Sequence, residues 1–350
     1  MFFKKKPIKR FPPPFRQKKK APPRRRSFPI IFFGVLCFCI WFIYTSLAPN
    51  LPKPEEPIRL YSNQCQQDLR LTLLEAIKKS HSSIHLVMFG LSDRAVLSAL
   101  AQKIGEDIAT TVYYDPKGSP RLEKVLDGGD IHPVKTAGLM HRKILILDDE
   151  TVFVGSANMT TASLRMHDNL VIGMMNKKVA SFLKNHAPNS PGYMRTMVGG
   201  QDVELWLLPD PRGHALTDLR KKIRSANHSI RIALFTFTHP NLLEEVIQAH
   251  RRGVKVTVVV DMHSTFGASA RTIDSLKKAG VQILMSQGVQ LLHHKFIYID
   301  EHTLLTGSAN WTKSAFYKNS DCIVILHNLN PEQKAFMNRL WNQIQSSAKG

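Results

Sequence analysis

The stretch HRKILILDDETVFVGSAN, residues 141–158, recurs as HHKFIYIDEHTLLTGSAN at residues 293–310. In each copy a Lys follows the His by two positions and an Asp follows the Lys by five. Gly-Ser-Ala-Asn then begins seven residues after that Asp. The shared template is H-x-K-x4-D-x6-G-S-x-N, with identical spacing in both copies. Internal repetition of this kind indicates a chain built from two similar units.

Each copy has the pattern of a β-hairpin, in which a short apolar run, a polar turn and a second apolar run follow one another. Side chains alternate along a strand, so the His and the Lys project from the same face. Gly155 and Gly307 allow the backbone to bend where the second strand ends. We therefore expect Ser and Asn to return beside the His-Lys pair. The runs and turns are residues 144–147, 148–150 and 151–154, and residues 296–299, 300–302 and 303–305.

A single His-x-Lys is usually a pair of polar residues on the wet face of a strand, and a single Gly-Ser-x-Asn is usually a turn. Five residue types that recur at one spacing in both halves favour a functional site over these readings. On these residues the chain resembles the phospholipase D superfamily over about residues 58–345. The two HKD motifs of that family match His141, Lys143, Asp148, His293, Lys295 and Asp300.

Two imidazoles in one cationic pocket suit the chemistry of a phosphodiester. A neutral imidazole can attack phosphorus to give a phosphohistidine, and a protonated one can give its proton to the departing oxygen. Because the first proton bound disfavours the second, two such groups titrate apart and supply both forms near neutral pH. Donors from Lys and Asn would stabilise charge on the phosphoryl oxygens.

The resemblance implies two α/β halves that pack about a pseudo-twofold axis, with one shared active site where the motifs meet. It implies His141 as the nucleophile and His293 as the acid, although the residues alone do not fix that order. Asp148 and Asp300 are expected to brace the site rather than react. No cofactor and no metal are implied, and the catalytic unit is expected to be a monomer. The expected phosphate-binding residues are Lys143, Lys295, Ser156, Asn158, Ser308 and Asn310.

A carboxylate that follows the motif commonly orients an active-site imidazole in this superfamily. Asp321 lies 28 residues after His293 and fits that role, whereas the equivalent position after His141 is Asn169. A neutral amide gives an imidazolium less electrostatic support, so we expect the first site to be less activated. Alternatively, a shift of register would bring the neighbouring Asp168 into the same role.

The N-terminal region differs from the rest of the chain. Residues 1–27 form a Pro-rich arm with twelve Lys or Arg and no acid, which leaves +9 of the net charge of +21 to the remainder. This composition is typical of a disordered tail. Residues 28–48 are apolar and long enough for a transmembrane anchor. The basic arm predicts a cytoplasmic N-terminus and a catalytic part on the far, extracytoplasmic side. Cleavage after Ser46-Leu47-Ala48, which would release a secreted protein, is the alternative.

Strands and helices alternate in the same order in both halves, which predicts an α/β fold of two α/β/α sandwich repeats with mixed sheets. Residues 49–57 are expected to be a linker, 58–186 the first repeat, 187–201 a second linker and 202–347 the second repeat. The strand ends at Asp115 and Asp261 match at an offset of 146 residues, while the motifs match at 152. About six residues were therefore gained in the second half, and we place them near residues 263–269.

The motifs alone do not choose the substrate, because members of the superfamily break or exchange phosphodiesters in phospholipids and in nucleic acids. The predicted anchor favours a phospholipid substrate at a membrane, with hydrolysis or phosphatidyl transfer as the reaction. A membrane-anchored endonuclease is the alternative, since a basic protein also suits nucleic acid. A non-catalytic scaffold is less favoured because both His-Lys pairs are intact. Cys65 and Cys322 permit one disulfide, but the apolar surroundings of Cys322 favour a small core residue.

Overall fold

The structure, a computed structural model, describes residues 1–2, 32–39, 49–287 and 290–349. It separates into the units Met1–Ala48 and Pro49–Gly350. In the first unit residues 32–39 are helical and exposed. No helix within the described ranges is long and apolar enough to cross a membrane. The rest of the predicted anchor and nearly all of the basic arm lie outside the described residues.

The first half is built on a mixed seven-stranded sheet in the order β1-β7-β6-β5-β2-β3-β4. Strands β2, β3 and β4 are parallel to one another, and the remaining neighbours are antiparallel. The strands are β1 (Arg59–Tyr61), β2 (Ser83–Met88), β3 (Ala109–Tyr114), β4 (Asp130–Pro133), β5 (Lys143–Leu147), β6 (Thr151–Gly155) and β7 (Val171–Met175).

The second half repeats this sheet in the order β9-β15-β14-β13-β10-β11-β12, and adds β8 and β16 at its two edges. Strand β8 lies inside residues 187–201, which we had expected to be a linker, because it pairs along its whole length with β9. The strands are β8 (Gly192–Val198), β9 (Gln201–Leu207), β10 (Ser229–Leu234), β11 (Lys255–Val260), β12 (Gln282–Ser286), β13 (Lys295–Ile299), β14 (Thr303–Gly307), β15 (Cys322–Leu326) and β16 (Ala348–Lys349).

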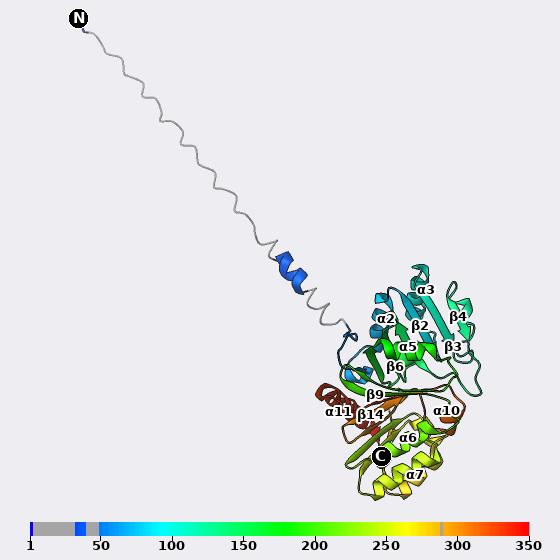
Figure 1. Cartoon of the computed structure of the whole chain (residues 1–350). Helices are drawn as coiled ribbons and strands as arrows, with labels where there is room; N and C mark the ends of the chain where they lie inside the picture. Colours follow the sequence, from blue (N-terminus) through cyan, green and yellow to red (C-terminus); the bar gives the residue numbers. More distant parts are fainter. Residues whose placement is uncertain (3–31, 40–48, 288–289, 350) are drawn as a thin grey trace. The chain divides into compact units, whose positions relative to one another are not determined.

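Helices cover the outer face of each sheet. Figure 1 shows α2 and α3 on one side of the unit Pro49–Gly350 and α6 and α7 on the other. The helices are α2 (Leu69–Lys79), α3 (Arg94–Gly105), α4 (Thr161–Arg165), α5 (Lys177–Asn185), α6 (His214–Arg224), α7 (Pro240–Arg251), α8 (Met262–Phe266), α9 (Ala270–Lys278), α10 (Lys313–Tyr317) and α11 (Pro331–Ser346). The 3₁₀ turns η1 (Asn63–Cys65) and η2 (Leu122–Lys124) complete the set.

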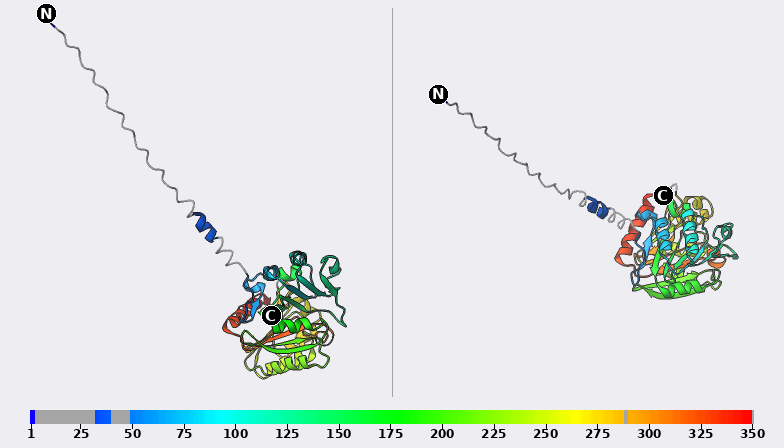
Figure 2. Two further views of the ribbon diagram at one scale, coloured as in Figure 1. Left: turned by 45° about the horizontal axis from the view of Figure 1, so that its top comes forward. Right: turned by 90° about the horizontal axis from the view of Figure 1, so that it is seen from above.

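The inner faces of the two sheets share one apolar core. Ile144 and Val154 of the first sheet belong to the same buried cluster as Phe296 and Val324 of the second. Helices α5 and α11 contribute to this cluster as well, while separate clusters lie under the outer helices of each half. The outer face of each sheet is therefore covered by helices, and the inner face packs against the other half and against α5 and α11 (Figure 2). Two mixed-sheet α/β halves are confirmed, but they are not independent sandwiches.

Both motif copies form the predicted hairpins, β5–β6 and β13–β14. Asp148 and Asp149 have φ of 55°, and Asp300 and Glu301 have φ of 50° and 55°. Two consecutive residues with positive φ make a type I′ turn, whose twist matches that of the flanking strands, and Asp tolerates this conformation. The turns fix the register of each hairpin and so the positions of the His and Lys at its start.

Candidate active site

The two motif histidines lie immediately before β5 and β13, and each is held by backbone of the opposite half. The amide of His141 donates to the carbonyl of Ser320 (2.7 Å), and the amide of His293 donates to the carbonyl of Asp168 (2.9 Å). Short parallel bridges join Met140 to Ser320 and Asp168 to Leu292. Two equivalent crossings of the interface therefore bring both motifs to one place.

The side chain behind each imidazole also comes from the opposite half. Nδ1 of His141 lies 2.8 Å from Oδ1 of Asp321, and Nδ1 of His293 lies 3.0 Å from Oδ1 of Asn169. Our expectation that the first site would be the less activated was therefore wrong, because it paired each histidine with the residue of its own half. The carboxylate supports His141, and the amide supports His293.

The serines of the Gly-Ser-x-Asn segments stand behind these groups. Ser308 Oγ donates to Asp321 Oδ1 (2.6 Å), and Ser156 Oγ donates to Asn169 Oδ1 (2.8 Å). Both serines are fully buried. The hydroxyl of Ser156 also accepts from the amide of Leu170, and the hydroxyl of Ser308 accepts from the amide of Cys322. We had expected these two serines to contact phosphate. Instead their hydroxyls orient Asn169 and Asp321, which in turn orient the two imidazoles.

The glycine before each serine permits this close approach. A Cβ on Gly307 would lie 2.1 Å from the carbonyl oxygen of Cys322, and one on Gly155 would lie 2.3 Å from that of Leu170. Without side chains at these positions, the amides of Ser156 and Ser308 donate to the same two carbonyls at 3.0 and 2.9 Å. The motif glycines are thus needed for strand contact at the floor of the site.

Lys143 and Lys295 are buried, and each lies beside the histidine of its own motif. Each ammonium donates to the carbonyl of its own motif histidine, at 2.7 and 2.8 Å, and lies 5.2 and 5.4 Å from the ring centre of Phe89 and Phe235 respectively. Burial lowers the pKa of Lys143 to about 7, partly offset by Asp321 and Asp115. Burial and the charge of Lys143 lower the pKa of Lys295 well below its ordinary value. An anion between them would favour their charged forms.

Asn158 and Asn310 complete the cluster predicted from the motif. Both are half-buried, and the Oδ1 atom of each is buried without a hydrogen-bond partner among the described residues. Buried polar atoms are normally paired, so an unpaired amide oxygen at the same place in both motifs indicates an acceptor available to a donor group of a ligand.

The surroundings of the two imidazoles lower the pKa of both. Burial and the ammonium of Lys143 lower the pKa of His141, while Asp321 opposes that change. Burial and both lysines lower the pKa of His293 further, and His141 itself contributes to this depression. The pKa of Asp321 lies below its usual value because His141, Ser308 and Lys143 outweigh the effect of burial. The site therefore combines the carboxylate of Asp321, two imidazoles whose neutral forms are favoured and two lysines whose charge an anion would restore.

The motif aspartates lie at the far end of the same strands. Oδ1 of Asp148 accepts from the backbone amides of His81, Ser82 and Ser83, at 2.8–3.2 Å. The carboxylate of Asp300 accepts from the equivalent amides of residues 227–229 at 2.7–2.8 Å. The structure does not bring either carboxylate to the imidazoles. Asp148 holds the backbone at the start of β2, and Asp300 holds the backbone at the start of β10.

Asp168 does not replace Asn169. Its backbone forms the bridge to the second half, whereas the imidazole of His293 contacts the side chain of Asn169. The carboxyl group of Asp168 is buried near Asp261, and burial together with that charge raises its pKa to about 7. Asp168 thus lies beside the site without contacting either imidazole through its side chain.

Several residues of the site had not been assigned from sequence. Asp115 and Asp261 each accept a backbone amide of the residue before a motif histidine, Met140 at 2.8 Å and Leu292 at 3.1 Å. Their matching positions at the ends of β3 and β11 were visible as a repeat and could have identified them. His167, whose ring centre lies 6.1 Å from that of His293, has no counterpart in the repeat and gave no such signal.

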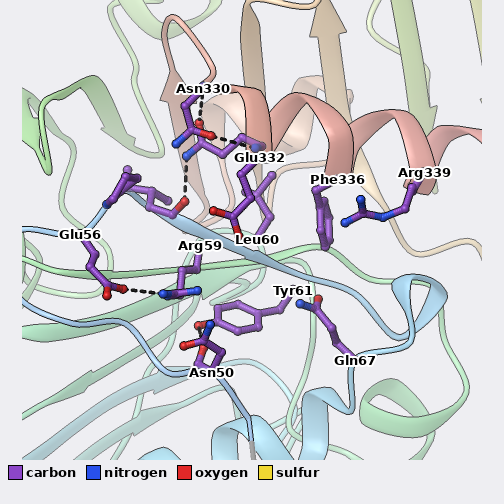
Figure 3. A pocket seen from close by; sticks show the side chains of 13 residues that line it. Asn50, Glu56, Arg59, Leu60, Tyr61, Gln67, Asn330, Glu332, Phe336 and Arg339 are labelled. Carbon is purple, nitrogen blue, oxygen red and sulfur yellow. Dashed lines mark hydrogen bonds and ion pairs between the residues drawn. The ribbon is translucent and has the colours of Figure 1, made fainter. Parts of the chain in front are cut away.

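The described residues contain no group of three His, Cys, Asp or Glu side chains placed to hold a metal ion. A separate cavity of about 380 Å³ lies where β1 meets α11 and contains none of the motif residues. Figure 3 shows Arg59 joined to Glu56 on one side of this cavity, with Phe336 and Arg339 of α11 on the other. This cavity is part of the seam between the halves and not of the histidine site.

Cys322 is fully buried, as expected of a core residue, and neither Cys65 nor Cys322 is in a disulfide. Trp311 and Phe316, which follow the second motif, are also buried, whereas Tyr317 is 40% exposed. Trp311 and Phe316 therefore pack in the core.

Comparison with known proteins identifies the family of this chain. Residues 73–188 and 219–346 match the sequence profile of the family described as "Cardiolipin synthase, PLD-like domain". The mitochondrial cardiolipin hydrolase of Xenopus laevis is 35% identical over 132 residues, which cover 37% of this chain and 62% of that protein. Cardiolipin synthase B of Salmonella typhi is 23% identical over 298 residues, which cover 78% of this chain and 70% of that protein.

Among solved structures, the phosphatidylserine synthase of Haemophilus influenzae has the same fold, with a TM-score of 0.67 and 13% identity over 85% of this chain and 88% of that one. The chain spans 46–62% of the length of the cardiolipin hydrolases of Xenopus laevis, Mus musculus and Canis lupus familiaris. The family profile covers more than half of the chain, including both motif hairpins and the residues that back their histidines. The chain therefore belongs to the phospholipase D superfamily.

Proposed function

We propose that this protein is a phosphodiesterase of phospholipase D type, which hydrolyses phospholipids or transfers their phosphatidyl group through a phosphohistidine. One observation carries the assignment of roles: a carboxylate backs His141 and an amide backs His293. Both partners accept the Nδ1 proton of a neutral ring, which directs each Nε2 into the site.

His141 is the nucleophile in this proposal. Attack on phosphorus leaves positive charge on its ring, and the carboxylate of Asp321 stabilises that charge. The bond from Nε2 to phosphorus forms as the bond from phosphorus to the leaving oxygen breaks. The phosphodiester anion raises the pKa of His293, so its ring takes up a proton when the substrate binds and gives that proton to the leaving oxygen. The neutral partner Asn169 does not retain that proton electrostatically, so transfer is favoured.

The remaining groups act on the phosphoryl oxygens. Lys143 and Lys295 become fully protonated when the substrate anion lies between them, because an adjacent negative charge raises an ammonium pKa. Their charges, with the amide groups of Asn158 and Asn310, stabilise the transition state. In the second step neutral His293 accepts a proton from water or from an alcohol, which attacks phosphorus and frees His141.

We propose a phospholipid as the substrate for two reasons. The matched family and the relatives named above are described by their action on cardiolipin or phosphatidylserine. The apolar segment at residues 28–48 would also hold the catalytic unit beside a bilayer as a single-pass anchor, with the N-terminus cytoplasmic. An endonuclease of the same mechanism is the alternative that the test below includes.

The test compares His141→Ala and His293→Ala on two kinds of substrate. Bis(p-nitrophenyl) phosphate has a leaving group that departs without a proton, whereas a phospholipid releases an alkoxide that needs one. We expect His141→Ala to lose activity on both. We expect His293→Ala to lose phospholipid turnover but to give a burst of p-nitrophenol and a trapped adduct on His141.

The opposite pattern, with the burst retained in His141→Ala, would exchange the two roles. Turnover of single-stranded DNA with no release of phosphatidate from mixed phospholipid vesicles would replace the lipid substrate by nucleic acid. Absence of any turnover by the unsubstituted protein would contradict the proposed function.

A further inference from the structure

We propose that a pocket beside His293, formed by the second half together with Met166 and His167 of the first, binds the alcohol that leaves the phosphodiester and the alcohol that replaces it. This assignment rests on the proposed function and names one part of the substrate. The pocket has a volume of about 350 Å³. We call it the alcohol pocket, and its polar lining consists of His167, Asp261, His263, Ser286 and Gln290.

The alcohol pocket shares a wall with the proposed acid. The ring of His167 lines the pocket and its centre lies 6.1 Å from the ring centre of His293. Asp261 also lines the pocket, and its carboxylate accepts from the amide of Leu292, immediately before His293. In an in-line displacement the leaving oxygen lies opposite the attacking atom, next to the group that protonates it. The leaving alcohol must therefore extend from the His293 side of phosphorus, where this pocket lies.

The lining suits a ligand that carries hydroxyl or amino groups. It offers imidazole nitrogens, a hydroxyl and an amide, and it contains neither Lys nor Arg. The buried carboxylate of Asp261 already accepts from three backbone amides and from Ser286, so it contributes negative charge rather than a free acceptor. Asp168 adds a second carboxyl group near Asp261. These acceptors favour hydrogen-bond donors and positive charge, and they disfavour another phosphate. The chemical class is thus a short polyol, such as glycerol, or an amino alcohol.

The equivalent place in the first half is closed. The repeat puts Lys318 and Asn319 at the positions of Met166 and His167. Asn319 Oδ1 accepts from the amide of Leu139 (3.1 Å), and a Cβ on Gly138 would lie 2.2 Å from that same oxygen. Asn319 therefore packs tightly into the space that corresponds to the pocket.

An insertion builds the wall of the alcohol pocket. Ser119 Oγ accepts the amide of Leu91 (2.8 Å), and Ser269 Oγ accepts the amide of Phe237 (2.9 Å), so the two serines are equivalent. Ser119 lies four residues after Asp115, whereas Ser269 lies eight residues after Asp261. The four extra residues accommodate α8, from which Met262 and His263 reach the pocket. The insertion that forms α8 thus lies in the half that supplies the proposed acid, His293.

Partition of the covalent intermediate tests the assignment. The full-length protein is given one phospholipid together with equal concentrations of glycerol and 1-butanol, and the ratio of the two transfer products is measured. This ratio is set after the intermediate has formed, so it does not depend on the amount of folded protein. We expect glycerol to be preferred, and His263→Leu and Gln290→Leu each to lower the glycerol-to-butanol ratio by about tenfold, as expected for one lost hydrogen bond.

Lys117→Leu is the matched control, since Lys117 is the exposed counterpart of His263 in the first half and should leave the ratio unchanged. Replacing glycerol by ethanolamine in the same assay shows whether an amino group is taken as well as a hydroxyl. An unchanged ratio in both pocket variants would overturn the assignment while leaving the proposed function in place. Absence of turnover in the unsubstituted protein would instead remove both.

Discussion

The two active-site histidines occur in the same motif but have different partners. Asp321 places a full negative charge next to the ring of His141, whereas Asn169 offers His293 only the dipole of an amide. Hydrogen bonding to a carboxylate favours the protonated ring by more than hydrogen bonding to an amide does. The difference is one side-chain group, and in the proposed mechanism it separates the nucleophile from the acid.

Exchange of that group should change the pH profile in a defined direction. Asn169→Asp puts a carboxylate behind His293 and raises its pKa. The general acid must be protonated, and its activity is lost as the pH rises through that pKa. The alkaline limb of kcat/KM should therefore move to higher pH, measured with a phospholipid substrate.

Asp321→Asn provides the matched control for this prediction. It removes the group that raises the pKa of His141, which must be neutral to attack. The acidic limb should move to lower pH, and kcat should fall by about 10²–10⁴-fold because the cationic ring loses its support. A shift of the alkaline limb in the wrong direction, or no shift in either variant, would contradict the division of roles.

Each hairpin element carries its functional residues at one end and its structural carboxylate at the other. Asp148 lies five residues after Lys143, beyond the end of β5, and binds the three amides that precede β2. Burial alone would raise the pKa of this carboxyl, but these hydrogen bonds and that of the Ser82 hydroxyl hold it below its usual value. The aspartate of the motif is thus a brace between two neighbouring strands.

Asp148→Ala should lower the free energy of unfolding by about 2–3 kcal/mol, because several charge-assisted hydrogen bonds are lost at once. The kcat of the folded fraction should remain within about twofold, since a small change far from the imidazoles has little effect on the barrier. Because the folded pKa is depressed, the stabilisation is present above the unfolded pKa and lost as the pH falls through the folded one. Urea unfolding at pH 7 and at acidic pH measures the loss of stability and its pH dependence, and activity per folded molecule measures kcat. A severe loss of kcat would instead show that Asp148 takes part in the reaction.

Local elements followed closely from sequence, and contacts between elements did not. Helix α2 buries Leu69, Leu73 and Ile77, whose spacing of four residues is that of one helix face, and both hairpins have the predicted turns. The residues that back the histidines were found by spacing, yet their partners were exchanged between halves. Periodicity specifies which face of a strand is buried, but it carries no information on which neighbouring sheet lies against that face.

The whole catalytic unit behaves as a single body because the two sheets share their inner core. Arg142 adds a polar connection, since its buried guanidinium donates to the carbonyls of Ala187, Ser190 and Leu208 near the join of the two halves. Removal of one half would expose an apolar sheet face and remove the partner of the other half's histidine. The repeats are therefore units of sequence more than units of folding.

We expect both halves to unfold in one transition. Trp206, Trp311 and Trp341 all belong to the second half, so tryptophan fluorescence of Pro49–Gly350 reports that half, while far-UV circular dichroism reports both. The two denaturation curves should coincide. Separate midpoints would show that the shared core does not couple the halves.

The crossed contacts have a consequence for how such a chain diverges. Residue 141 contacts 321 while 293 contacts 169, which is the reciprocal pattern of a twofold interface between identical subunits. In a dimer of identical single-repeat chains, every substitution appears twice, and both imidazoles would share one kind of neighbour. Joining the copies in one polypeptide lifts that restriction. A tandem gene can therefore keep a carboxylate behind one histidine and an amide behind the other, and a pocket beside His293 that Asn319 fills at the equivalent place. A symmetric dimer cannot keep such differences.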